Sequence, residues 1–394
     1  MEDRYNRQRR IKYWDQEQLA NARVLLIGAG ALGNEILKNL VLLGIGRIMV
    51  VDFDHIEASN LSRTVLFRTE DRHRPKAEVA AKAAAQLNPD VQVSFLDGDV
   101  FFDLGLGFYS HADLIISGLD NLAARAKVAQ SAYLTARPFL DSGIWALGGE
   151  VRCFLPNKSF CFDCTLSDTD WQNAHFRRSC TGFRAAEELH EPAASNIATV
   201  SIIGGMVAQE TVKLIGGFGE KIGNRGIESG DALVYNGIKL SLGTSRLAGD
   251  AVCDCRMGKP LEQIEQLAKS VFDTTAAEIL SIAEEKIGSP ATLELGRDLL
   301  IGFKKECEQP NCGFDANNSG EISLMAKMDE SKRVCIDCGK YQTPIVVSRA
   351  TRESAIKNLT LHQLGIPPGE ILCFWHFDQV CYFELSEDIR ALWP

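Results

Sequence analysis

Short apolar runs alternate with stretches of helical periodicity through the first 140 residues of the chain. The first run, Val24 to Ile27, is followed by apolar residues at helical spacing from Ala31 to Leu43, and then by a second run, Arg47 to Val51. Apolar runs bounded by turn residues are typical of buried parallel strands, and a spacing of three and four predicts a helix. The alternation predicts a doubly wound, Rossmann-like, mostly parallel α/β sheet.

The same pattern continues along the chain. Further strands are expected at Val91 to Leu96, Asp113 to Ser117, Pro138 to Asp141 and Glu150 to Leu155, and helices at Lys76 to Leu87, Ala123 to Ala136 and Ile197 to Ile215. The last of these helices contains Gly204 and Gly205, which indicate the close approach of another element.

A glycine turn joins the first strand to the first helix. Gly28, Gly30 and Gly33 form a Gly-x-Gly-x-x-Gly motif, with Ala31 inside it, and Asp52 ends the next strand about 20 residues later. Glycines let the backbone approach a phosphate, the helix N-terminus offers N–H groups to it, and the acid can bond a ribose hydroxyl. The motif predicts a bound nucleotide but does not by itself separate NAD from ATP.

Polar residues follow the expected strand ends. Since ligands of open α/β sheets bind at the carboxyl ends of the strands, these residues are candidates for the nucleotide site. Lys76 follows Pro75 at the expected start of a helix, where an unpaired lysine is unfavourable to the helix dipole and suggests a nearby anion. Asp120 is a candidate magnesium ligand, with a helix N-cap as the alternative. The candidates are Asp54, Ser59, Asn60, Arg63, Lys76, Asp120 and Asn121.

Several of the twelve cysteines come in closely spaced pairs. In a reducing compartment such pairs indicate zinc sites rather than disulfides. One structural Cys₄ site is expected from the pairs Cys161/Cys164 and Cys253/Cys255, and a zinc knuckle from Cys307, Cys312, Cys335 and Cys338.

Cys180 stands apart from these pairs. Arg177 and Arg178 precede it closely, and positive neighbours lower the pKa of a thiol. The surrounding segment, about 165–195, is long and polar, which predicts a loop. Cys180 is therefore a candidate nucleophile, with an incidental surface cysteine as the alternative.

The chain is expected to divide into a nucleotide-binding domain, residues 1–256, and a smaller α+β region, residues 257–394. In the second region, helices are expected at Leu261 to Lys286 and at Leu293 to Lys305. Strands are expected at Ile345 to Val347 and Ile371 to Leu385.

Composition narrows the class of protein. A hydrophobic fraction of 45% and a charged fraction of 24% are those of an ordinary globular protein. The net charge of −10 argues against general nucleic-acid binding. The first ten residues are too charged for a signal peptide, and no apolar run is long enough to span a bilayer. We therefore expect a cytoplasmic protein without a membrane partner.

Taken together, these motifs resemble the ThiF/MoeB and ubiquitin-activating enzyme superfamily. The matching blocks follow the family's order over residues 1 to about 256, and NAD enzymes lack both the arginine arm and the Asn-Leu-x-Arg loop. The blocks are Arg4 to Gln8, Gly28 to Gly33, Asp52 to Asp54, Ser59 to Arg63, Pro75-Lys76, Asp120-Asn121 and the first two cysteine pairs.

The resemblance implies an ATP-dependent adenylation of the C-terminal glycine of a ubiquitin-like protein, with Mg²⁺. It implies that Asp52 binds the ribose, that Asn60, Arg63 and Lys76 hold phosphates, and that Asp120 binds magnesium. Arg7 would reach the site of a second copy in a homodimer, and Cys180 would take the carboxylate as a thioester. Ala31 stands where many relatives have glycine.

The branch of the family is a separate question. The helix sequence after the glycines and the extension of about 140 residues favour a bacterial ubiquitin-activating type that passes its cargo to a conjugating enzyme, as in antiphage operons. The alternatives are a sulfur-carrier adenylyltransferase for cofactor synthesis, an NAD-dependent oxidoreductase and a non-catalytic zinc-stabilised scaffold.

Overall fold

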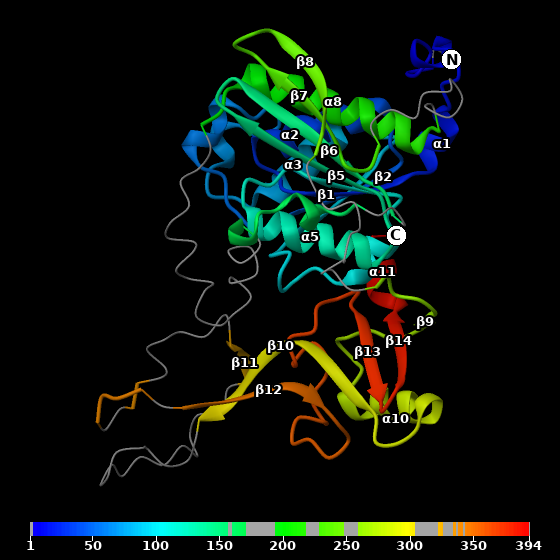
Figure 1. The fold of residues 1–394 in the computed structure, drawn as a ribbon, viewed down its shortest axis with the longest axis vertical. Helices are drawn as coiled ribbons and strands as arrows, with labels where there is room; N and C mark the ends of the chain where they lie inside the picture. The colour runs from blue at the N-terminus through cyan, green and yellow to red at the C-terminus, as the bar shows by residue number, and fades with distance from the viewer. Residues whose placement is uncertain are drawn as a thin grey trace. The chain divides into compact units, whose positions relative to one another are not determined.

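The computed structural model describes residues 3–156, 160–170, 194–217, 228–247, 259–303, 322–325, 334–335, 338–341 and 343–393. These residues fall into two units, which are treated separately below (Figure 1). The first unit takes in the described residues up to Leu261, together with Trp393, and the second takes in residues 262–392. The boundary expected between residues 256 and 257 lies outside the described residues.

The first unit is built on an eight-stranded sheet with the order β3-β2-β1-β4-β5-β6-β7-β8. Neighbours from β3 to β5 run parallel, and those from β5 to β8 run antiparallel. The predicted doubly wound, mostly parallel sheet is therefore confirmed, with an antiparallel extension. The strands are β1 (Arg23–Ile27), β2 (Arg47–Asp52), β3 (Gln92–Asp97), β4 (Leu114–Ser117), β5 (Phe139–Trp145), β6 (Gly148–Phe154), β7 (Asp231–Asn236) and β8 (Ser241–Arg246).

Helices cover both faces of this sheet (Figure 1). Helix α2 packs against α3 and α8 on one face, and α4 and α5 pack together on the other. The α-helices are α1 (Gln16–Asn21), α2 (Ala31–Leu43), α3 (Lys76–Leu87), α4 (Leu106–Ser110), α5 (Leu122–Leu134) and α8 (Ile197–Ile215). Short 3₁₀ helices are η1 (Gln8–Arg10), η2 (Ala58–Ser62), η3 (Thr69–Asp71) and η4 (Phe162–Thr165).

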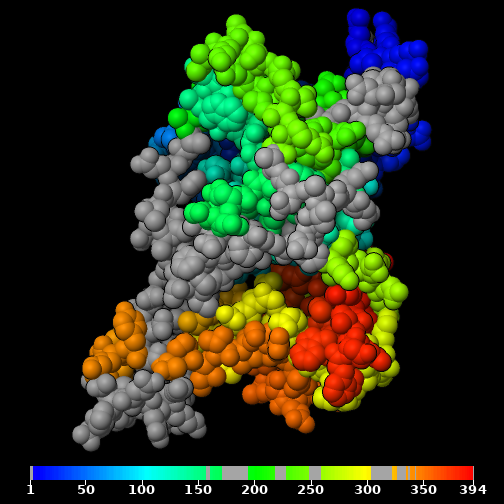
Figure 2. Space-filling view, viewed as in Figure 1, coloured from blue at the N-terminus to red at the C-terminus, as the bar shows by residue number. Residues whose placement is uncertain are grey.

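Burial follows the position of each strand in the sheet. Residues 24–27 of β1 are completely buried, as expected for a central strand with helices on both faces. Edge strand β8 is exposed at every position, and its hairpin with β7 lies on the surface in light green (Figure 2). The buried centre of the sheet is therefore the part that carries the glycine turn.

The second unit contains a six-stranded sheet with the order β11-β10-β13-β14-β9 and with β12 paired to β10. Helix α10 supplies Ile279, Leu280 and Ala283 to its core. The elements are β9 (Ile264–Leu267), α10 (Ala276–Ile287), β10 (Thr292–Phe303), β11 (Ser323–Leu324), β12 (Pro344–Ala350), β13 (Ile371–His376), β14 (Gln379–Leu385) and α11 (Ser386–Leu392).

Two sequence predictions for this unit are wrong. Residues 293–305 were expected to be helical, but residues 292–303 form strand β10, in which Leu293 and Leu295 are buried on one face. A bulge between Glu294 and Leu299, with Gly296 at φ +67°, then breaks the two-residue period and imitates helical spacing. The helix expected from residue 261 begins only at Ala276, which follows a Thr275–Glu278 capping box.

No helix in the described part of the chain is both long enough and apolar enough to cross a membrane.

The two adjacent glycines of α8 generate a stability prediction. A Cβ on Gly204 would lie 2.6 Å from Cγ of Glu35 on α2, whereas a Cβ on Gly205 would have nothing within 4 Å. Gly204→Ala should therefore lower the free energy of unfolding by about 1–3 kcal/mol through overpacking. Gly205→Ala, the matched control, should raise it by about 0.5–1 kcal/mol by favouring the helix. Urea denaturation measures the free energy of unfolding of both variants, and equal effects would contradict a close contact between α2 and α8 at Gly204.

Candidate functional site

The glycine turn brings the start of α2 directly over the end of β1. Gly28 has φ +95°, and its N–H donates to the carbonyl oxygen of Val51 at 2.8 Å. A Cβ on Gly33 would lie 1.8 Å from the Gly28 carbonyl oxygen, so only glycine fits there. A Cβ on Gly30, by contrast, would have nothing within 4 Å. The turn therefore leaves open space at Gly30, where the N-terminus of α2 presents its N–H groups.

The loop that follows β4 packs against the same turn. The N–H of Gly118 donates to the carbonyl oxygen of Ile27 at 2.9 Å, and a Cβ on Gly118 would lie 3.0 Å from the Gly33 nitrogen. Asp120 is exposed two residues later. The N-cap of α5 is Asn121, whose Oδ1 accepts N–H bonds from residues 123 and 124. The capping alternative for Asp120 is therefore wrong, because its neighbour caps the helix.

Asp52 ends β2 beside the glycine turn. Its Oδ2 accepts the Ala29 N–H at 2.7 Å, and its Oδ1 accepts the Asp54 N–H at 2.8 Å. Burial of the carboxyl group raises the pKa of Asp52 to about 6, although the positive charge of Lys76 acts in the opposite direction. The carboxylate thus holds the turn and the following loop together.

Lys76 is the first residue of α3 and is only 9% exposed. Its Nζ lies 2.7 Å from Oδ2 of Asp54, and its N–H donates to the Asp54 carbonyl oxygen at 2.8 Å. Sequence reasoning assigned both side chains to the nucleotide and did not foresee that they pair with each other. The ion pair holds a buried cation one step away from Asp52 and the glycine turn.

The loop after β2 contains the short helix η2. Glu57 is the N-cap residue of η2, and in this capping box Oδ1 of Asn60 accepts the Glu57 N–H at 2.9 Å. The Arg63 guanidinium donates to the Ser59 carbonyl oxygen at 2.6 Å. Arg63 and Asn60 are therefore held by their own loop.

A buried ion pair was missed by the sequence reasoning. Arg125 on α5 donates from Nε to Oδ1 of Asp141 at 2.8 Å and from a second nitrogen to Oδ2. Asp141 on β5 is completely buried, and the Arg125 guanidinium also lies 6.0 Å from the ring of Phe162. The only signal in the sequence is that Arg125 lies one helical turn after the N-cap Asn121. The pair fixes α5, and with it the Asp120 loop, to the sheet.

The sequence comparisons identify the family that has this glycine turn. A sequence profile of the ThiF family matches residues 5–256. The chain belongs to the ThiF family. This match covers more than half of the chain and includes every strand of the first unit.

Relatives of two kinds share this ThiF region. The human ubiquitin-like modifier-activating enzyme 7 is 44% identical over 170 residues, which are 41% of this chain and 17% of that protein. The yeast ubiquitin-activating enzyme E1-like protein is 37% identical over 156 residues, 39% of this chain and 24% of that protein. The sulfur carrier protein ThiS adenylyltransferase of Escherichia coli is 28% identical over 239 residues, 60% of this chain and 88% of that protein. The chain thus spans a quarter or less of the human and yeast proteins.

Solved structures support the same fold. The microcin C7 biosynthetic enzyme MccB in complex with N-formylated MccA superimposes with a TM-score of 0.53 at 21% identity, over 64% of this chain and 74% of that one. At this identity the similarity supports the ThiF-type fold alone.

The N-terminal arm of this ThiF-family chain packs far from its own glycine turn. The hydroxyl group of Tyr5 accepts a bond from Asn88 at 2.7 Å, and Arg4 donates to the Leu87 carbonyl oxygen at 2.7 Å. Both partners lie at the C-terminal end of α3, whereas the glycine turn lies at the N-terminal end of α2. Arg7 is exposed on this arm. It therefore lies at the amino edge of the sheet rather than with Lys76 and Asp120 at the carboxyl edge.

The predicted cysteine sites are only partly described. The Sγ atoms of Cys161 and Cys164 lie 3.6 Å apart. In the second unit the N–H of Gly339, which follows Cys338, donates to the carbonyl oxygen of Cys335 at 2.8 Å. The other predicted cysteines lie outside the described residues, namely Cys180, Cys253, Cys255, Cys307 and Cys312. Within the described ranges, no group of three or more His, Cys, Asp or Glu side chains is placed to hold a metal ion.

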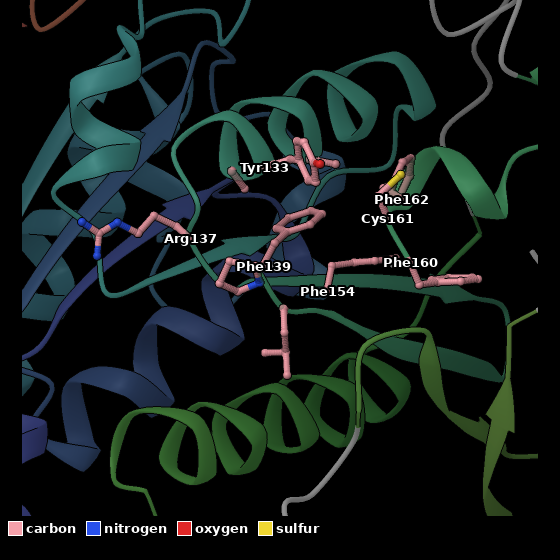
Figure 3. Close-up of a pocket in the computed structure, with 11 residues that line it drawn as sticks. Tyr133, Arg137, Phe139, Phe154, Phe160, Cys161 and Phe162 are labelled. Carbon is pink, nitrogen blue, oxygen red and sulfur yellow. The ribbon is translucent and has the colours of Figure 1, made fainter. Parts of the chain in front are cut away.

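A small apolar cavity lies beside Cys161 (Figure 3). Phe139, Phe154 and Phe162 line it, and in Figure 3 the Arg137 side chain extends away from these rings. None of the predicted nucleotide-site residues lines this cavity, so it is separate from the site at the glycine turn.

The raised pKa of Asp52 predicts a pH-dependent stability. The folded chain keeps the Asp52 proton up to about pH 6, whereas an unfolded chain loses it near its ordinary value of 3.8. The bound proton of Asp52 therefore adds to the free energy of unfolding below about pH 4, and this stabilisation is lost as the pH rises to 6. Asp52→Asn does not titrate, so its free energy of unfolding should gain about 3 kcal/mol relative to the wild type between pH 3.5 and 7.

Urea denaturation across this pH range measures the difference. Asp90→Asn, which removes an exposed carboxylate, corrects for the change in net charge. A difference between wild type and Asp52→Asn that does not vary with pH would contradict the raised pKa.

Proposed function

We propose that this ThiF-family chain uses MgATP to adenylate the C-terminal glycine carboxylate of a ubiquitin-like protein. The observation that carries the proposal is the buried Lys76, which is held against Asp54 within one hydrogen-bonded step of Asp52 and the glycine turn. A cation at this place can neutralise the phosphate that the N-terminus of α2 attracts. An oxidoreductase that used NAD would leave Lys76, Arg63 and the arginine arm without a role.

The proposed reaction needs positioning and charge neutralisation more than covalent help. A carboxylate oxygen of the incoming tail attacks the α-phosphorus of ATP; a new P–O bond forms, the bond to the β-phosphate oxygen breaks, and pyrophosphate leaves. In this proposal Asp52 bonds the ribose, and Arg63, Lys76 and Asn60 hold the phosphate charge. Other residues shape the site, namely Gly28, Gly30, Ala31, Gly33, Asp54, Ser59 and Asn121. Asp120 would hold Mg²⁺, which neutralises phosphate charge when bound; one exposed carboxylate with phosphate oxygens and water fits this ion.

A homodimer is part of the proposal. Helix α2 is 13 residues long and so spans about 20 Å between the two edges of the sheet. Because the arm is bound at the amino edge of its own sheet, the placement of Arg7 supports a role at the site of a second copy.

Thioester formation is proposed for Cys180. In this step the thiolate attacks the acyl carbon of the acyl-adenylate, a C–S bond forms, and AMP leaves. The two arginines just before it in the sequence favour the thiolate.

Two zinc sites are also proposed. Thiolates on the edge of a tetrahedral Zn²⁺ site lie about 3.8 Å apart, close to the 3.6 Å between Cys161 and Cys164. Cys253 and Cys255 would complete this site. Cys335 and Cys338 form a turn in which Gly339 has φ +69°, a geometry that suits a knuckle completed by Cys307 and Cys312. Zinc would have a structural role in both.

The proposal also names the branch of the ThiF family to which the chain belongs. The human ubiquitin-like modifier-activating enzyme 7 has the higher sequence identity to this chain, whereas the match to the ThiS adenylyltransferase covers more of the chain. We favour transfer to a conjugating enzyme in an antiphage-type conjugation system, with residues 257–394 recruiting the ubiquitin-like protein or the conjugating enzyme. A sulfur-carrier adenylyltransferase is the second candidate, supported by the coverage of the ThiS enzyme.

Thermal unfolding tests the nucleotide. MgATP at 100 times its Kd should stabilise the full chain by about 2.7 kcal/mol, and NAD should have no effect. Lys76→Met should raise the Kd for MgATP at least about tenfold because it removes the buried cation. Lys82→Met on the same helix is the matched control, since Lys82 is exposed and paired with Glu78. Stabilisation by NAD rather than MgATP would overturn the adenylation proposal.

A panel of ubiquitin-like proteins ending in glycine tests the thioester. With the protein that supports ATP–pyrophosphate exchange, Cys180→Ala should abolish the thioester seen on non-reducing gels and keep the exchange. Cys153→Ala is the control, because burial raises the pKa of the Cys153 thiol to about 12 and leaves it protonated. A thioester retained by Cys180→Ala would refute this assignment.

A further inference from the structure

Asn34 is a completely buried amide on α2 that the roles proposed above do not use. Its Oδ1 accepts N–H bonds from Val65 at 2.9 Å and from Leu66 at 2.7 Å. Since both partners are donors, the amide oxygen rather than the nitrogen must face them. The helix also holds Asn34 close to the glycine turn, because its own N–H donates to Gly30 at 2.9 Å.

These bonds connect the phosphate-binding helix to the loop that carries Arg63. Val65 follows Arg63 by two residues, and Leu66 is only 4% exposed. At the start of the same loop, Asn60 accepts the Glu57 N–H. The start of the loop is thus held by its own capping box, and its C-terminal end is fixed to a side chain of α2.

Packing alone does not account for an amide at this position. Nδ2 of Asn34 is buried and has no hydrogen-bond partner among the described atoms, which costs free energy. The compensating gain is the oxygen that accepts two backbone N–H groups of the Arg63 loop.

We propose that Asn34 is a positioning residue that sets the distance between Arg63 and the phosphate bound at the N-terminus of α2. The inference rests on the proposed binding of MgATP. Because the phosphate-binding N–H groups and Asn34 belong to one helix, any displacement of the loop from Asn34 changes the reach of Arg63 to the phosphate.

A double-mutant cycle in the full chain tests this role, with the Kd for MgATP measured by calorimetry. Asn34→Ala should raise the Kd about tenfold when Arg63 is present. In an Arg63→Ala background the same substitution should change the Kd less than about twofold, because its effect acts through Arg63. The same factor in both backgrounds would overturn the inference. A merely structural role would lower the Tm without depending on Arg63.

Two further variants keep the result interpretable. Thr211→Ala removes a buried hydroxyl that donates to Val207 on α8, so it controls for a loss of stability and should leave the Kd unchanged. If Asn34→Ala does not fold, Asn34→Ser enters the cycle with the same criterion. A wild-type chain that does not bind MgATP overturns the proposed function and this inference together, whereas wild-type binding with an additive cycle overturns only the role of Asn34.

Discussion

The contact between two backbones, at Gly28 and Gly33, determines how the first unit can bind a ligand. A Cβ on Gly33 would lie 1.8 Å from the Gly28 carbonyl oxygen, and Gly118 closes the same contact from the next strand. This packing places the first N–H groups of α2 directly above the carboxyl edge of the sheet. Of the three glycines of the turn, Gly30 alone faces open space, so at this point the backbone can meet the ligand directly.

Charge beside the glycine turn is organised around the buried Lys76. Asp52 bonds the turn at Ala29 and the following loop at Asp54, and Asp54 in turn holds Lys76. A lysine at the N-terminus of a helix is opposed by the helix dipole, so the Asp54 carboxylate compensates for its position. A bound phosphate would supply the same compensation. The pair therefore keeps Lys76 in place without a ligand, and we expect Asp54, which is half exposed, to give way to a phosphate.

Local patterns predicted the parts of the fold that depend on local physics. The strands β1 and β2 and the helix between them follow from their hydrophobic periods and the glycines, and helix α8 has the predicted bounds. Strand β10 was missed because its bulge imitates a helical spacing. The Arg125–Asp141 pair could not be predicted, since it joins a helix to a strand 16 residues away and no local rule marks a buried arginine.

Three amide side chains help to fix the loops at the carboxyl edge, beside the carboxylates of Asp52 and Glu57. Asn121 caps α5, Asn60 accepts the N–H of Glu57 at the start of η2, and Asn34 accepts two N–H groups from the Arg63 loop. Aspartate would serve about equally well as the N-cap of α5, so capping strength does not explain the amide at position 121. Each carboxylate would, however, add a negative charge to an edge that we propose receives a triphosphate, and repulsion in a partly buried site is screened only weakly. The neutral acceptors Asn34, Asn60 and Asn121 add no further negative charge to that of Asp52 and Glu57, and so do not weaken the attraction of Lys76 and Arg63 for phosphate.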